Sequence, residues 1–145
     1  MSRKTIGIVG LAVAAVVSLP ALAAAETFDG AYRGMIVCEK LQTSPFMLRA
    51  PFDITITGKN VIAARPIFNR LGNRVVGSEI ATGTVGDDGA IKLVSNWKAG
   101  NASYVGNYGG TLTGKGGTLT GTQAWVMPAG QQTRTCTLAV IQTKS

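Results

Sequence analysis

Short stretches in which apolar and polar residues alternate recur along most of this chain, and they constrain its fold more than any other feature. The clearest is 52–57, where Phe52, Ile54 and Ile56 share one face and polar residues occupy the other. Clusters of small and polar turn residues, such as 58–60 and 86–89, separate the stretches. Alternation with a period of two is typical of half-buried strands, and such clusters are typical of tight turns. No amphipathic helix of useful length interrupts the pattern, so an all-β fold is predicted.

Eight strands account for the pattern, and the connections between them are short enough for antiparallel neighbours. We expect them over 31–39, 52–57, 61–67, 74–85, 90–98, 102–113, 117–127 and 134–143. The inward face of 74–85 can contain Val76 and Ile80, or instead Val75, Ala81 and Val85, and the pattern does not choose between them. Eight sequential strands form either an antiparallel up-and-down barrel or a β-sandwich.

The first residues are organised as a secretory signal peptide. Arg3 and Lys4 precede an apolar stretch over 6–19, and small residues follow it up to Ala25. The apolar stretch is shorter than the ~20 residues of a membrane-spanning helix. We therefore expect residues 1–25 to be removed. This leaves a single domain over 26–145 with no transmembrane segment, located in the periplasm or secreted.

Two cysteines favour the barrel over the sandwich. Export to an oxidising compartment favours a disulfide between Cys38 and Cys136, whereas metal ligation by two free thiols would require further Cys or His residues, and the chain has no His. Cys38 lies near the end of the first strand and Cys136 near the start of the last. In a closed barrel those strands are antiparallel neighbours, so the bond would join the first strand to the last.

The composition argues against catalysis and against nucleic-acid binding. The formal net charge is +7, of which Arg3 and Lys4 contribute two, and this charge is not dense enough to indicate a nucleic-acid partner. The absence of His removes Ser-His and Cys-His nucleophilic systems. Among the carboxylates, only Glu39 and Glu79 are expected near the interior or the rim, and we interpret both as solvated strand residues. No enzyme activity, metal or cofactor is predicted.

The candidate ligand site lies at one end of the predicted barrel. The connections over 40–50, 68–73 and 128–133 are longer than the others, and odd-numbered connections share one end of an up-and-down barrel. Aromatic walls with basic groups suit an apolar or sugar-like ligand that carries a negative charge, whereas an aromatic plug with solvated arginines is the structural alternative. The candidate residues at this mouth are Trp97, Tyr104, Trp125, Arg65, Phe68, Arg70 and Arg74.

Several short motifs carry a resemblance to known proteins. Phe28–Gly34, Tyr108–Leu112, Gly121–Gln123 and Cys136–Leu138 resemble uncharacterised small secreted proteins of alpha-proteobacteria. The expected architecture is also similar to the avidin and lipocalin class and to periplasmic protease inhibitors built on a small barrel. That likeness concerns form alone, because no biotin-site pattern or lipocalin signature is present to be carried over.

Two functions are compatible with these observations. The first is an exported, non-enzymatic binding protein that holds a small anionic or envelope-derived molecule at the barrel mouth. The alternative is an interaction protein, such as an inhibitor of a secreted protease or a partner of another envelope protein. A cavity in the folded protein would favour the first, and a solid core with an ordered protruding loop would favour the second.

The exported protein is predicted to begin at Glu26 and to contain no free thiol. Intact-mass measurement with and without an alkylating reagent checks both expectations. A start displaced by more than a few residues, or two alkylatable cysteines in the native protein, would contradict them.

Overall fold

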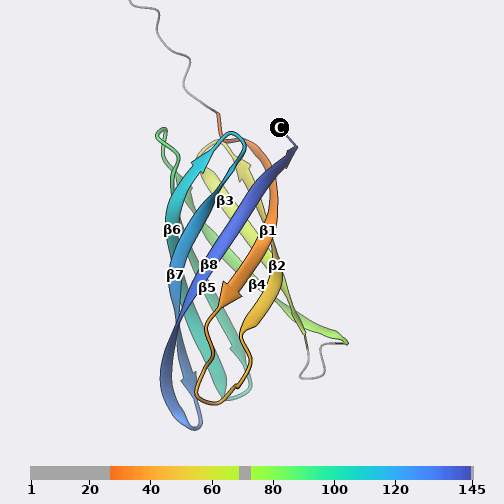
Figure 1. The fold of residues 1–145 in the computed structure, drawn as a ribbon, viewed down its shortest axis with the longest axis vertical. Coiled ribbons are helices and arrows are strands. Elements are labelled where there is room, and N and C mark those ends of the chain that lie inside the picture. The colour runs from red at the N-terminus through yellow and green to blue at the C-terminus, as the bar shows by residue number, and fades with distance from the viewer. Residues whose placement is uncertain (1–26, 69–72, 145) are drawn as a thin grey trace, which may run out of the picture.

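The computed structural model describes residues 27–68 and 73–144, which form one closed antiparallel barrel (Figure 1). Its strands follow one another around the ring in chain order: β1 (Gly30–Cys38), β2 (Leu48–Thr57), β3 (Asn60–Phe68), β4 (Val75–Val85), β5 (Ala90–Ala99), β6 (Ala102–Thr113), β7 (Gly116–Met127) and β8 (Gly130–Lys144). The prediction of an eight-stranded up-and-down barrel is confirmed. Within the described ranges, no helix has the length and apolar character needed to cross a membrane. The expected signal peptide lies outside the described residues.

The ring closes where β1 pairs with β8. Cys38 and Cys136 stand directly opposite each other in that ladder and are joined by a disulfide across a sequence separation of 98 residues. Both cysteines are buried. The bond therefore fixes the first strand to the last near the end of the barrel where β1 ends and β8 begins. We call this end, with the connections after β1, β3, β5 and β7, the mouth.

One expected long connection at the mouth is absent. The predicted loop over 128–133 is wrong, because β8 begins at Gly130 and only Pro128 and Ala129 separate it from β7. Gly130 adopts a φ of 119°, which favours glycine, and pairs with Met127 to close the turn. The polar run that follows, Gln131–Thr133, forms strand without an apolar face, so the sequence shows no alternation there.

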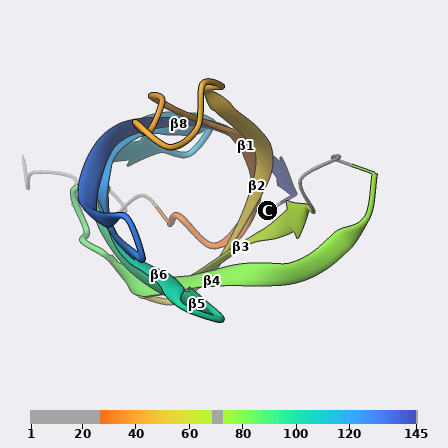
Figure 2. The ribbon, with the colours of Figure 1, turned by 90° about the horizontal axis from the view of Figure 1, so that it is seen from below.

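The hairpin of β3 and β4 extends past the barrel wall on one side of the mouth. The β2–β3 ladder ends at Asp53 and Ala64, and the β4–β5 ladder ends at Ile80 and Asn96. The β3–β4 ladder continues beyond both, as far as Phe68. Figure 2 shows the start of β4 reaching away from the ring.

The inward face of β4 contains Glu79, Ala81 and Val85, which are all buried, whereas Val76 and Ile80 are exposed. Of the two predicted inward sets, the one that contains Ala81 and Val85 is therefore correct for these two residues. Val75 departs from that set, because it lies on the extended part of the hairpin and is 55% exposed.

An apolar core fills the barrel from the closed end towards its middle. Phe52, Ile54 and Leu138 are among its fully buried members, and Phe28 is buried just before β1. Gly34 pairs with Val140 in the ladder between β1 and β8, and a Cβ at this position would overlap the backbone of Ala139 and Val140. Glycine is therefore required for the close approach of the two strands that close the ring.

Replacing both Cys38 and Cys136 with Ala should lower the free energy of unfolding by a few kcal/mol. The chain-entropy account gives roughly 4 to 5 kcal/mol for a loop of about 100 residues, and measured effects are often smaller. Far-UV circular dichroism should retain the β signal, because eight hydrogen-bonded ladders remain. Urea titration of the double variant and the parent checks this, and equal midpoints would show that the bond does not stabilise the closure.

Candidate functional site

A buried ion pair lies at the boundary between the barrel and the extended hairpin. Arg65 on β3 and Glu79 on β4 are direct partners in the ladder, and they are the first pair beyond the ends of the β2–β3 and β4–β5 ladders. The Arg65 Nε donates a short hydrogen bond to Glu79 Oε2. The two side chains are only 6% and 0% exposed. The interpretation of Glu79 as a solvated strand residue is therefore wrong, whereas Glu39 is exposed as expected.

The second carboxylate oxygen of Glu79 is held from β5 and β6. Ser95 Oγ donates to Glu79 Oε1 at 2.6 Å, and the Tyr108 hydroxyl donates to the same oxygen at 3.3 Å. Gly106 makes room for this arrangement, because a Cβ there would overlap Ser95 Oγ and lie 2.6 Å from the Tyr108 hydroxyl oxygen. The Tyr108 ring packs edge-on against Phe52, with 6.3 Å between centroids. Tyr108 thus joins the apolar core to the polar side chains of Arg65, Glu79 and Ser95, which lie on the mouth side of the core and which we call the polar layer.

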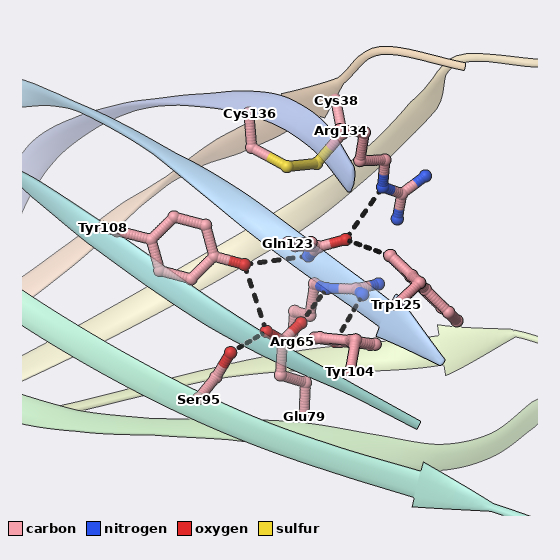
Figure 3. A network of polar contacts seen from close by, with 10 residues as sticks. All are labelled: Cys38, Arg65, Glu79, Ser95, Tyr104, Tyr108, Gln123, Trp125, Arg134 and Cys136. Carbon is pink, nitrogen blue, oxygen red and sulfur yellow. Dashed lines mark hydrogen bonds and ion pairs between the residues drawn. A yellow bond between two sulfur atoms is a disulfide. The ribbon is translucent and has the colours of Figure 1, made fainter. Parts of the chain in front are cut away.

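Gln123 on β7 continues the network towards β8 (Figure 3). Its Nε2 donates to the Tyr108 hydroxyl at 2.8 Å, while its Oε1 accepts from Arg134 Nε at 2.8 Å and from Trp125 Nε1 at 3.2 Å. Gln123 is completely buried. The two hydrogen bonds to Gln123 Oε1 therefore fix the orientations of Trp125 and Arg134.

Burial and charge shift the pKa values of this layer. Burial and then the negative charge of Glu79 raise the pKa of Tyr108 to about 12. Burial also raises the pKa of Tyr104, whose hydroxyl accepts from Arg65 Nη2 at 2.9 Å. Burial alone would lower the pKa of Arg65, but the charge and hydrogen bonds of Glu79 outweigh it and raise that pKa. Both tyrosines are neutral and Arg65 is charged at ordinary pH.

Arg134 differs from Arg65 in having no carboxylate partner. Burial and then the positive charge of Arg65 lower the pKa of Arg134. Among the described residues, no carboxylate oxygen lies within 4.0 Å of its guanidinium, and only its Nε donates a hydrogen bond. No fully buried side-chain nitrogen or oxygen of the described chain lacks a partner. The two terminal nitrogens of Arg134, which have none in Figure 3, therefore reach solvent.

Three aromatic side chains form a cluster on the mouth side of this network. Trp97 and Tyr104 are stacked with 5.5 Å between ring centroids, Tyr104 and Trp125 lie 4.5 Å apart, and Trp97 and Trp125 lie 5.6 Å apart. The guanidinium of Arg134 lies over the Trp125 ring, 5.2 Å from its centroid. The three rings thus form an aromatic wall, and the cation of Arg134 lies against one of its ring faces.

The polar layer and the aromatic wall border an open cleft of about 770 Å³ at the mouth. Arg65 and Arg134 line it together with Trp97, Tyr104 and Trp125. Most of the remaining lining is apolar and comes from the connection after β1, the start of β2 and the extended hairpin: Met47, Leu48, Ile67, Phe68 and Val76. Ser44 and the exposed Arg49 are polar members of the same lining. The volume lies within the range of small-molecule sites. The apolar core therefore lies towards one end of the barrel, and the cleft opens at the other.

The structure brings five of the seven predicted site residues to this cleft. Trp97, Tyr104, Trp125, Arg65 and Phe68 all line it. Arg74 is exposed and is not part of its lining. Arg70 lies outside the described residues. Trp97 and Trp125, both predicted at the mouth, contact each other. The buried charged side chains Arg65, Glu79 and Arg134 form what we call the floor of the mouth, and of the three predicted arginines only Arg65 is among them.

Sequence reasoning missed Arg134, Gln123, Ser95 and the burial of Glu79. Each of these residues is in phase with recognised inward positions: Arg134 with Cys136 and Leu138, for example, and Glu79 with Ala81. Extending the alternation through polar residues would have placed Ser95, Gln123 and Arg134 on the inward face, whereas the two possible faces of 74–85 left Glu79 undecided.

The donor groups of this cleft do not suggest a metal. In the described part of the chain, no group of three or more Cys, Asp or Glu side chains is placed to hold a metal ion.

Comparison with known proteins gives no relative: no family model matches the chain, and neither the curated proteins nor the solved structures contain a significant match. The function is therefore inferred from the geometry of the cleft.

Replacing Glu79 with Ala should lower the free energy of unfolding by about 3–5 kcal/mol, because Arg65 would remain buried without its counter-charge. The double variant Arg65→Met with Glu79→Met should recover most of that loss, since it removes both charges. Denaturant titration measures both effects.

The exposed pair Arg33–Asp53 provides the matched control. Its Nε–Oδ1 distance is 3.1 Å and its side chains are 74% and 58% exposed. Asp53→Ala should therefore change the free energy of unfolding by less than about 1 kcal/mol. Equal effects of Glu79→Ala and Asp53→Ala would contradict the assigned role of the buried pair.

Proposed function

We propose that this protein is an exported, non-enzymatic binding protein whose barrel mouth holds a small amphipathic anion. The observation that carries the proposal is Arg134. Its guanidinium is part of the cleft floor, has no carboxylate partner and directs its terminal nitrogens to solvent. A buried cation is stabilised by a counter-charge, and the forked edge of a guanidinium matches a carboxylate, sulfonate or phosphate.

The walls of the cleft indicate the rest of the ligand. One side consists of the aromatic cluster, and the other consists of apolar side chains that include Met47, Ile67 and Phe68. Phe68 is 44% exposed and Met47 is 47% exposed, so both have surface that a ligand would cover. Contact with these walls supplies apolar burial, while Arg134 supplies orientation. The combination favours a molecule with an apolar body and one anionic end.

The hollow mouth favours ligand binding over the alternative of an interaction protein. An inhibitor that acts through a loop requires no cavity beneath that loop. Here the cleft reaches a floor in which Arg65 is paired with Glu79, whereas Arg134 has no carboxylate partner among the described residues. Preorganised groups of this kind reduce the entropic cost of binding a small ligand.

Anilinonaphthalene sulfonate and phenylnaphthylamine form a matched pair of fluorescent probes, since they share their ring systems and differ in the sulfonate. The folded protein should bind the sulfonate more tightly, and Arg134→Met should weaken its binding about tenfold or more, as expected for loss of a hydrogen bond to a charged group. Binding of phenylnaphthylamine should change little. Fluorescence titration measures both.

Arg33→Met is the control for loss of a positive charge elsewhere, because Arg33 lies on the exposed outer face and pairs with Asp53. It should leave both titrations unchanged. Near-UV circular dichroism of each variant shows that the core remains packed, which matters because the sulfonate probe also binds partly unfolded states. Failure of the folded parent to bind the sulfonate, or equal binding by Arg134→Met, would contradict the proposal and favour the interaction protein.

A further inference from the structure

The floor of the mouth contains three charged side chains that are all nearly inaccessible to solvent. Arg65 is 6% exposed, Arg134 is 7% exposed and Glu79 is completely buried. The Glu79 carboxylate is committed to Arg65, and it also accepts from Ser95 and Tyr108. Two cations and one anion leave this floor with one uncompensated positive charge, which belongs to Arg134.

The remaining charged groups at the mouth do not alter that balance in the interior. The described ones are all exposed: Glu39, Lys40, Arg49, Arg74 and Lys98. Charges in contact with solvent are screened within a short distance, whereas buried charges are screened much less. Arg49 is the exposed one that lines the cleft. The charge that a deeply placed ligand meets is therefore that of Arg134, with the neutralised pair beside it.

We infer that the mouth selects ligands with a single negative charge, and that Glu79 determines this selectivity; the inference rests on the proposed anion site. One negative charge on Arg134 neutralises the floor. A second negative charge at the same place would find no second unpaired cation in the buried floor, because Arg49, which also lines the cleft, is exposed and screened by solvent. It would lose its hydration and would face the Glu79 carboxylate across the guanidinium groups. Like charges brought together in a poorly hydrated site are strongly disfavoured. Glu79 thus acts as a specificity-determining residue while remaining beneath the cleft.

Octyl phosphate provides the test, because its second proton dissociates with a pKa of about 6. The same molecule is a monoanion at about pH 5 and a dianion at about pH 8. Octanesulfonate is a monoanion throughout and has the same alkyl length. The chain has no His, the side chain that most commonly changes charge between about pH 5 and pH 8, and octanesulfonate controls for any change in the protein itself. A change seen with octyl phosphate alone therefore reports the charge of the ligand.

Competition against bound anilinonaphthalene sulfonate gives the affinities. Octyl phosphate should bind about tenfold more tightly at the lower pH, whereas octanesulfonate should bind with nearly equal affinity at both. Glu79→Gln should narrow or invert the difference for octyl phosphate, because it leaves two positive charges on the floor. Asp53→Asn, which removes an exposed carboxylate from the outer wall, should leave the difference unchanged.

The outcomes separate this inference from the proposed function. If neither octyl compound displaces the probe, the anion site and the inference are both wrong. If both bind and the phosphate binds equally or more tightly as a dianion, the mouth holds anions without selecting a single charge, and only the inference is overturned. The comparison on the parent protein decides the single-charge selectivity even if Glu79→Gln does not fold, and the folded variant decides the role of Glu79.

Discussion

Pairing of β1 with β8 converts a meander with two open edges into a ring, and the interior of the molecule depends on that contact. The ladder runs along most of β1 and is joined covalently at Cys38 and Cys136. Closure also places Arg134, two residues before Cys136, in the same network as Arg65 from β3 and Glu79 from β4. The bond that closes the barrel and the cation that faces the cleft are therefore positioned by the same stretch of β8.

The polar layer is stable in this position because nearly every hydrogen-bonding group in it has a partner. Glu79 accepts from three side chains, and Gln123 uses both its amide nitrogen and its oxygen. Buried polar groups are costly when they are unpaired, and a fully connected network fixes side-chain orientation. The terminal nitrogens of Arg134 have no hydrogen-bond partner in the described chain, and Arg134 lines the cleft. Within the described residues, the fully buried side-chain nitrogens and oxygens all have partners.

Much of this fold could be predicted from the sequence, because its strands alternate clearly and their turns contain glycine and polar residues. The pairing of Cys38 with Cys136 and the meeting of Trp97 with Trp125 both follow from the topology. The charged floor was missed because an inward polar residue looks the same as an outward one when only apolar positions mark the buried face. Glu79 illustrates this, since its burial depends on Arg65 being its ladder partner. Register across β3 and β4 is not determined by the alternation of either strand alone.

The extension of the β3–β4 hairpin has a consequence for how such a scaffold can diversify. Beyond the pair Arg65–Glu79, its two arms are hydrogen-bonded to each other and to no other strand. Insertions or substitutions over 66–68 and 75–78 would reshape one wall of the mouth without shifting the register of the remaining ladders. Sequence changes in this extension can therefore alter the shape of the mouth while the residues that close and fill the barrel stay the same. A single barrel of this kind could give rise to descendants that keep the same closure and core but differ in the mouth.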